Sequence, residues 1–228
     1  MKILITSGGT SEKIDQVRSI TNHSTGQLGK IIAETFLKQG DQVTLVTSKR
    51  ALKPQQQDNL TIIAIETVAD LLASLENLVQ SHDVLIHSMA VSDYTPVYMA
   101  GFSQLNGAQD LSEFLHQKNQ ESKISSQEEH QVLFLKKTPK IISLVKDWNP
   151  QIRLIGFKLL VHVPKEELIA TARKSLIENK AELIVANDLV DINQEGHLAY
   201  LVQEEEQSQA KTKEEIAQLL VKHIHHER

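Results

Sequence analysis

The sequence predicts an α/β protein with a doubly wound, Rossmann-like and mostly parallel sheet that carries helices on both faces. Its strand-like segments are near-continuous apolar runs, which is typical of strands buried on both sides. Segments with helical spacing of apolar residues alternate with those runs. The chain has 228 residues, a length that suits one domain, residues 1–228. Ligands of such sheets bind beyond the carboxyl ends of the strands, so the loops there are candidates for the site.

The first half of the chain reads as four strands and two helices. The strands are expected at Lys2–Ser7, Gln42–Ser48, Leu60–Ile65 and Asp83–Ala90. The first helix carries apolar residues at Leu28, Ile31, Ile32 and Phe36 and ends at Gly40. The second carries Val68, Leu71, Leu72, Leu75, Leu78 and Val79.

The rhythm breaks between Tyr98 and Gln131, where a polar stretch with little periodic burial is either functional or disordered. Strands are expected again at Gln131–Leu135, Arg153–Val161 and Ala181–Ala186, and a late edge strand at His197–Val202. Helices are expected after Pro139, over Lys165–Asn179, and at the end of the chain, where Thr212 and Glu215 form a capping box.

Composition excludes several classes of function. The chain has no cysteine, which rules out disulfides, zinc–thiolate sites and cysteine nucleophiles. A net charge of −5 and a 4% aromatic content argue against nucleic-acid binding. The opening apolar run is too short for a signal peptide, and no stretch approaches the roughly 20 residues of a membrane span. We therefore expect a cytoplasmic protein that binds no membrane.

Two polar loops are candidates for chemistry. Ser7-Gly8-Gly9-Thr10 follows the first strand, and its glycines and hydroxyls predict either contact with a nucleotide phosphate or only a tight turn. Arg18–Gly29 brings a cation, amides, an imidazole and hydroxyls to the start of a helix, which favours an anion. The plainer alternative is a polar loop with Ser24 or Thr25 as N-cap.

These loops, with four further segments, resemble the phosphopantothenate–cysteine ligase (phosphopantothenoylcysteine synthetase) family. The resemblance covers essentially the whole chain, and the Asn-His-Ser-x-Gly run is its specific part. The segments that carry it are Gly8–Thr10, Val17–Gly29 (VRSITNHSTGQLG), Ala90–Tyr94 (AVSDY), Lys136–Ile142 (KKTPKII), Gly156-Phe157 and Ala186-Asn187-Asp188. In many bacteria this domain follows a flavin-dependent decarboxylase, whereas this chain begins at the ligase part, so we expect a stand-alone form with no flavin.

The family resemblance implies a reaction in coenzyme A biosynthesis. The carboxylate of 4′-phosphopantothenate attacks the α-phosphate of CTP, which releases pyrophosphate, and the amine of cysteine then displaces CMP to form an amide. A Mg²⁺ ion is expected on the triphosphate. The resemblance also implies a homodimer in which one subunit completes the other's site, with residues 98–131 as a mobile flap and dimerisation insertion.

The resemblance also implies roles for individual residues. Asn22 is expected to stabilise the reacting carboxyl group, and Lys123 to act from the flap on the triphosphate, although many relatives have further lysines where this chain has Ser125 and Ser126. Phosphopantothenate is expected to contact Arg18, Asn22 and Ala90. Nucleotide contacts are expected from Gly8, Gly9, Thr10, Ser24, Thr25, Gly26, Met89, Asp93, Lys123, Pro139, Lys140, Ile141, Ile142, Phe157 and Lys174, with Asp93 also the candidate metal ligand.

Other interpretations are open at the level of sequence. Ser48-Lys49-Arg50 after the second strand would suit an NADP-dependent reductase, although the first loop lacks the G-x-G-x-x-G pattern. A nucleotide sensor without catalysis is a further alternative. His223, His225 and His226 are expected to form a solvated tail rather than a metal site, and Asp188 and Asp191 to be turn residues at a strand end.

Overall fold

The computed structural model describes residues 1–193 and 196–226. Its centre is a sheet of eight strands in the order β12-β11-β10-β9-β6-β1-β4-β5. The six parallel members are β1 (Lys2–Ser7), β4 (Gln42–Ser48), β5 (Leu60–Ile65), β6 (Val84–His87), β9 (Arg153–Leu160) and β10 (Leu183–Asp188). Two antiparallel strands complete it, β11 (Ala199–Val202) and β12 (Gln207–Ala210).

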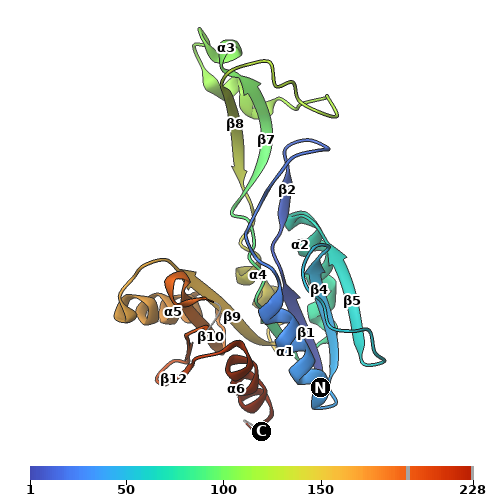
Figure 1. The fold of residues 1–228 in the computed structure, drawn as a ribbon, viewed down its shortest axis with the longest axis vertical. Helices are drawn as coiled ribbons and strands as arrows, with labels where there is room; N and C mark the ends of the chain where they lie inside the picture. The colour runs from blue at the N-terminus through green and yellow to red at the C-terminus, as the bar shows by residue number, and fades with distance from the viewer. Residues whose placement is uncertain (194–195, 227–228) are drawn as a thin grey trace.

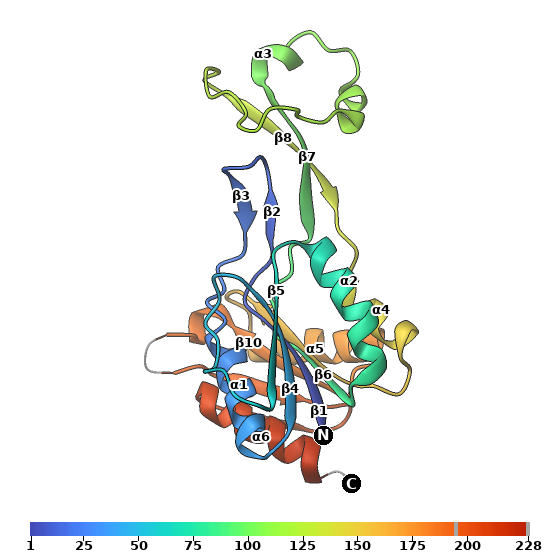
Figure 2. The same ribbon diagram turned by 90° about the vertical axis from the view of Figure 1, so that its right-hand side faces the viewer.

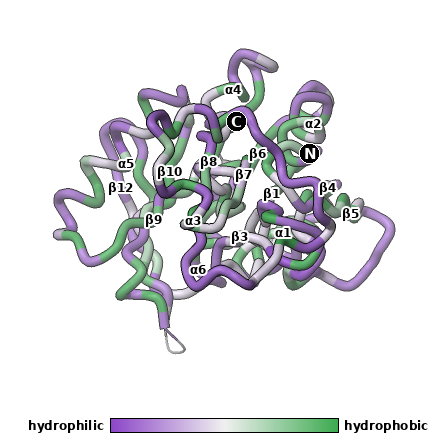
Figure 3. Tube along the Cα trace, turned by 90° about the horizontal axis from the view of Figure 1, so that it is seen from above, coloured by the Kyte–Doolittle hydropathy of each residue, from purple (hydrophilic) through white to green (hydrophobic). Residues whose placement is uncertain are grey.

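Helices cover both faces of this sheet, as the sequence predicts (Figure 3). On one face, buried side chains pack from α2 (Val68–Leu78), α4 (Ile141–Trp148) and α5 (Lys165–Asn179). On the other face they come from α1 (Gln27–Lys38) and α6 (Lys213–His226). Within the described residues, no helix has both the length and the apolar character needed to span a bilayer.

The sheet has a topological switch point between β1 and β6. From β1 the chain moves outward through β4 and β5, returns to β6 on the other side of β1, and continues to β9 and β10. The connections that leave the carboxyl ends of β1 and β6 therefore go to opposite sides, which opens a crevice between them.

Two projections leave the body near this crevice (Figures 1 and 2). The first is a hairpin of β2 (Ser11–Lys13) and β3 (Ser19–Thr21), in a segment where the sequence predicts only a polar loop. The second, which we call the arm, is the antiparallel pair β7 (Tyr94–Gly101) and β8 (Gln131–Lys137) with residues 102–130 at its far end. These 29 residues contain α3 (Phe102–Leu105) and a 3₁₀ turn, Leu111–His116.

The arm corrects the predicted boundaries of the insertion. The expected flap over residues 98–131 begins inside β7, because the pairing already starts at Tyr94 opposite Lys137. Only the last two residues of β7 are buried, so its sequence shows no apolar pattern that would predict a strand. Its partner supplies the backbone hydrogen bonds that keep it extended, and that pairing is not local in sequence.

The C-terminal region corrects two further predictions. The expected edge strand at His197–Val202 is covered by β12, which forms the true edge. The last helix has the first half of the predicted capping box, since the amide of Glu215 donates to Thr212 Oγ1 at 3.1 Å, while the Glu215 carboxylate accepts the amide of Lys211 at 2.6 Å. Its histidines are not a solvated tail, however: His223 Nε2 lies 2.6 Å from Glu182, and His225 Nε2 lies 2.9 Å from the buried Asp41. The side chain of His226 lies outside the described residues.

Candidate active site

Asn22 and Ala90 meet at the switch point. Asn22 ends the hairpin, Ala90 follows β6, and Asn22 Nδ2 donates to the Ala90 carbonyl at 3.1 Å. The same carbonyl accepts the amide of Thr10 at 3.1 Å, and the amide of Ala90 donates to Gly8 at 2.9 Å. The loops after β1, β3 and β6 are thereby joined beside the crevice, which places two residues predicted to bind phosphopantothenate in direct contact.

The two glycines after β1 are explained by packing of the chain on itself. A Cβ on Gly9 would lie 3.0 Å from the carbonyl oxygen of Asn22, so glycine lets the Asn22 loop approach β1. Gly8 has φ +81°, a backbone region that favours glycine, and a Cβ there would lie 2.4 Å from Ser48 Oγ. Contacts of either glycine with a nucleotide stay predictions.

Thr10 does not face the crevice, in contrast to its predicted nucleotide contact. Its side chain is fully buried, its hydroxyl donates to Ser92 Oγ at 3.0 Å, and its oxygen accepts the amide of Ser92 at 2.9 Å. Because its own amide is bound to Ala90, Thr10 has no donor left for a ligand. Its hydroxyl instead links the loop after β1 to the loop after β6 through the hydrogen bond to Ser92. Ser92 was not among the site residues predicted from the sequence.

Ser92 also touches the amide of Asn22. Asn22 Nδ2 lies 3.5 Å from Ser92 Oγ, at the outer limit of a hydrogen bond. The amide of Asn22 is thus held by Ala90 and only weakly by Ser92. The side chain of Asn22 is exposed, so a substrate can reach it.

The start of α1 lies on the same side of the crevice. The N-cap is Gly26, with φ +76° and no side-chain cap, which corrects the expectation that Ser24 or Thr25 caps the helix. Thr25 Oγ1 accepts only the amide of Gln27, at 3.3 Å. The first turn holds no acidic residue, so its free N–H groups retain the partial positive charge that attracts an anion.

Close packing holds this helix against β1. Ser7 Oγ donates to the Gly26 carbonyl at 3.1 Å. A Cβ on Gly29 would lie 2.2 Å from Ser7 Oγ. Glycine at position 29 therefore allows the helix to begin directly over the end of β1. The predicted phosphate contacts of Ser24, Thr25 and Gly26 need the helix to begin there.

A buried histidine supports the loop after β6. His87 Nδ1 lies 2.8 Å from Thr6 Oγ1, which also accepts the amide of Met89 at 3.2 Å. The Thr6 hydroxyl is therefore shared between the ring of His87 and the backbone of the loop after β6. Burial lowers the pKa of His87 to about 4, which keeps the ring neutral near pH 7. Met89 itself is buried, so only its backbone is close to the crevice.

The base of the arm adds Asp93 and Thr138 to the rim. The amide of Thr138 donates to the Asp93 carbonyl at 2.9 Å, and the hydroxyl of Thr138 donates to the Ser92 carbonyl at 2.6 Å. This brings the exposed Asp93 next to the segment that contains Pro139. Within the described residues no three side chains of His, Asp or Glu gather as a metal site, and the role of Asp93 as a metal ligand stays a prediction.

The remaining predicted nucleotide contacts are more dispersed. Ile141 and Ile142 pack with the α2, α4 and α5 face, whereas Phe157 packs with the α1 and α6 face. Lys140 Nζ and Lys174 Nζ each lie 3.9 Å from the carboxylate of Glu178, and both side chains are mostly exposed. Lys140 and Lys174 are therefore neighbours, while Phe157 and Ile142 are separated by the sheet.

Arg18 and Lys123 lie together at the tip of the hairpin, away from Asn22 at its base. Arg18 Nη2 lies 2.6 Å from Asp15 and donates to the carbonyl of Ile124 at 2.9 Å. Lys123 precedes Ile124 and is exposed. The structure thus brings together two predicted residues that sequence analysis assigned to different ligands, and it does not bring them to Asn22 of the same chain.

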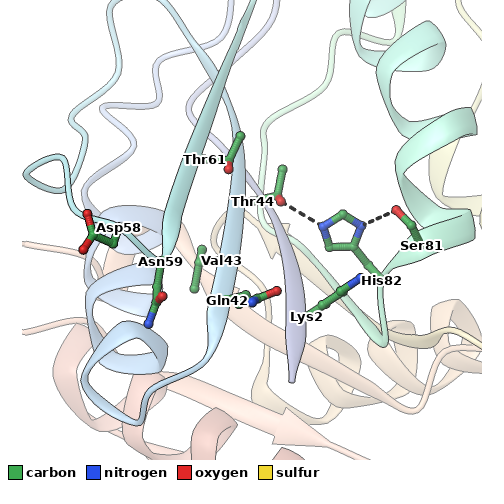
Figure 4. Close-up of a pocket in the computed structure, with 9 residues that line it drawn as sticks. All are labelled: Lys2, Gln42, Val43, Thr44, Asp58, Asn59, Thr61, Ser81 and His82. Atoms are coloured by element: carbon green, nitrogen blue, oxygen red, sulfur yellow. Dashed lines mark hydrogen bonds between the residues drawn. The ribbon is translucent and has the colours of Figure 1, made fainter.

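A polar pocket at the opposite end of the sheet is not the candidate site (Figure 4). Its lining comes from the amino ends of strands, including Lys2 of β1 and Gln42 of β4. The ring of His82 is already bound there, to Thr44 Oγ1 at 2.8 Å and to the Leu78 carbonyl at 2.7 Å. Both ring nitrogens of His82 therefore already have hydrogen-bond partners.

Comparisons with known proteins show the family of the chain. The family described as the C-terminal domain of DNA/pantothenate metabolism flavoproteins matches residues 1–102 and 107–227. A coenzyme A biosynthesis bifunctional protein CoaBC from Thermococcus kodakarensis is 34% identical over 88% of this chain, and one from Methanocaldococcus jannaschii is 32% identical over 82%. The chain spans less than half of these relatives, 44% and 40% of their lengths.

Solved structures give the same result. A DNA/pantothenate metabolism flavoprotein from Streptococcus pneumoniae superposes with a TM-score of 0.96 at 59% identity, covering all of both chains. The C-terminal domain of a CoaBC bifunctional protein superposes with a TM-score of 0.71 at 29% identity, over 98% of this chain and 93% of that one. None of these relatives supports the reductase alternative. The chain belongs to the family of the C-terminal domain of DNA/pantothenate metabolism flavoproteins.

Proposed function

We propose that the chain is a ligase that joins 4′-phosphopantothenate to cysteine in coenzyme A biosynthesis and cleaves CTP to CMP and pyrophosphate. The observation that carries the proposal is the contact between Asn22 and Ala90 at the switch point, beside the uncapped start of α1. There, a neutral amide can hydrogen-bond the reacting carboxylate, while the helix N-terminus can bind the phosphate that the carboxylate attacks.

The first half-reaction sets the main physical difficulty, because a carboxylate anion attacks an anionic α-phosphate. Catalysis of such a step comes chiefly from positioning and from fixed donors. The free amides at the start of α1, with Ser24, Thr25 and Gly26, are the groups that we assign to the nucleotide phosphates. Their charge is carried by the backbone and needs no rearrangement during the step.

The second half-reaction needs a donor for the oxygen of the acyl group. When the cysteine amine attacks the acyl-cytidylate, negative charge develops on that oxygen, CMP leaves with the electrons of the acyl–phosphate bond, and the amine loses a proton. Asn22 offers the N–H that Ser92 holds only weakly. Its other N–H stays on Ala90, which fixes the orientation of the amide through both half-reactions.

The donor set fits a magnesium ion that arrives with the nucleotide. Mg²⁺ keeps several waters and usually binds through phosphates and one or two carboxylates. Asp93 is an exposed carboxylate on the rim, and the described residues form no closed cage. The ion would neutralise charge on the triphosphate. The proposed reaction involves no electron transfer, and we therefore propose that it needs no flavin.

We further propose that two copies form a homodimer through the arm. Large apolar side chains are exposed on it: Tyr94 51%, Phe102 56%, Leu111 53%, Leu115 51% and Leu135 42%. Exposed apolar groups concentrated on one projection are typical of an interaction surface. A second copy would cover them and would bring the tip of one hairpin, with Arg18, toward the crevice of the other subunit.

The test is release of pyrophosphate by the purified protein given CTP, 4′-phosphopantothenate, cysteine and Mg²⁺. We expect one pyrophosphate for each amide formed, at the same rate with and without added flavin. Omission of phosphopantothenate should abolish the release, which excludes simple CTP hydrolysis. Pyrophosphate release with no amide product, or none at all with verified substrates, would show that the proposed reaction is wrong.

A further inference from the structure

Asp15 is a buried carboxylate at the turn of the β2–β3 hairpin. Its side chain is 1% exposed. Oδ1 accepts the amides of Val17 at 2.8 Å and Arg18 at 2.7 Å, which closes the turn locally. Oδ2 accepts Arg18 Nε at 3.0 Å and Nη2 at 2.6 Å. The guanidinium is thus held at two nitrogens by one oxygen.

The same carboxylate reaches across to the inserted segment of the arm. Oδ2 also accepts the amide of Ile124 at 3.1 Å, and Arg18 Nη2 donates to the carbonyl of the same residue at 2.9 Å. The amide of Gln16 donates to the carbonyl of Ser122 at 3.0 Å. Three hydrogen bonds therefore bracket Lys123 between two residues fixed to the hairpin, while the Lys123 side chain is exposed.

The chemistry of this junction distinguishes it from an ordinary loop contact. The pKa of Asp15 is held well below its usual range, mainly by the hydrogen bond from Arg18, so the carboxylate is charged at neutral pH. Three N–H groups donate to Oδ2, two from Arg18 and one from Ile124. An N–H group at the position of Oδ2 would therefore repel all three. The side chain of Arg18 is still 35% exposed, so part of its guanidinium faces solvent beside Lys123.

We propose that Asp15 is a positioning residue that makes Arg18 and Lys123 a single cationic unit in the proposed ligase. Through one carboxylate the hairpin tip and residues 122–124 are held in register, so the cation assigned to phosphopantothenate and the cation assigned to the triphosphate approach the anions together. The proposal rests on the proposed function for the identity of those anions, but not for the coupling itself.

The test compares Asp15→Asn with wild type by amide hydrogen exchange and by kinetics. The variant keeps the shape of the Asp15 side chain, but it removes the negative charge and replaces one carboxylate oxygen, an acceptor, with an NH₂ group, a donor. We expect at least tenfold faster exchange at Gln16 and Ile124, and KM for phosphopantothenate and for CTP to rise together, each by about tenfold, while kcat changes less than threefold. A merely structural defect would lower kcat or the folded fraction without moving both KM values in parallel.

Asp110→Asn is the matched control. Asp110 lies on the same inserted segment, and its carboxylate accepts only from Ser112, at 2.8 Å from the amide and 2.6 Å from the hydroxyl. It should leave exchange at Gln16 and Ile124 and both KM values unchanged. A Lys123→Ala variant supplies the second check: adding Asp15→Asn to it should raise KM for CTP by less than twofold further.

Two results would overturn the proposal. One is unchanged exchange at Gln16 and Ile124 in Asp15→Asn, which would show that the carboxylate does not hold the two segments together. The other is a full tenfold further rise in KM for CTP in the double variant, which would show that Asp15 does not act through Lys123. Failure of the ligase reaction in wild type would instead refute the proposed function, and the exchange measurement would still decide the coupling.

Discussion

Asn22 Nδ2 donates to the carbonyl oxygen of Ala90 at 3.1 Å, across 68 residues of sequence. The contact places an exposed amide at the carboxyl ends of β1 and β6, where doubly wound sheets bind ligands. Because the same carbonyl also binds the amide of Thr10, the position of Asn22 depends on the β1 loop as well as on β6.

Replacing Asn22 with Asp should uncouple the two half-reactions. A carboxylate cannot donate to Ala90 or to a developing oxyanion, so amide formation should slow by about 10²–10³-fold, the usual effect of losing one such donor. Acyl-cytidylate should still form and accumulate. Quenched-flow measurement of pyrophosphate and amide separates the steps. Asn106→Asp, on the arm, is the control, and a wild-type rate of amide formation by Asn22→Asp would contradict the role.

Thr10→Val should lower stability and activity together. Valine fills the buried space but leaves the amide and hydroxyl of Ser92 without their partner, and an unsatisfied buried polar group costs about 1–3 kcal/mol. We expect a loss of that size in the free energy of unfolding by urea. Thr10→Ser keeps the hydroxyl and should recover most of the activity, whereas equal activity of Thr10→Val and wild type would show that the bond to Ser92 is dispensable.

Stability should fall as the pH is lowered from about 6.5 to about 4. Burial lowers the pKa of His87 to about 4, and burial followed by the charge of Lys213 lowers that of His197 to about 4. In this window the unfolded chain takes up protons that the folded chain does not. The full contribution is present above pH 6.5, and each histidine accounts for at most about 3 kcal/mol.

The measurement for this prediction is the free energy of unfolding against pH. A His87→Gln variant removes one of the two titrating groups, so its free energy of unfolding should depend on pH about half as steeply between pH 6.5 and 4, whatever its absolute stability. His197→Gln should do the same. An unchanged slope in both variants would show that other groups control acid unfolding.

Polar substitutions on the arm should weaken dimerisation. Phe102→Ser with Leu111→Ser removes two side chains that are more than half exposed in one chain and that we expect to be buried against a second copy. Sedimentation equilibrium should show at least a tenfold rise in the dimer dissociation constant. Ile177→Ser, at a 68% exposed position on α5, is the matched control and should have no effect. A wild-type monomer at high concentration would refute the dimer.

Sequence patterns predicted the central sheet and its helices well, because their apolar periodicity is local. Lys2–Ser7, Gln42–Ser48 and Lys165–Asn179 were predicted with the observed bounds. The hairpin and β7 were missed because their strands are short or mostly exposed, and such strands are stabilised by their partners rather than by a buried face. Asp15 stands in a polar loop, where an Asp side chain often accepts the backbone amide two residues later and forms an Asx-turn. That tendency is the sequence signal that could have drawn attention to Asp15.

Local periodicity and motif order were enough to predict the doubly wound class and the grouping of candidate residues in the loops after β1 and β6. The tertiary contacts added that Thr10 faces inward, that Gly26 begins α1, and that one carboxylate, Asp15, binds both the Arg18 side chain and the backbone amide of Ile124, next to Lys123. Each of those depends on hydrogen bonds between segments distant in the chain. Such bonds are set by how buried donors and acceptors find partners once the sheet has formed.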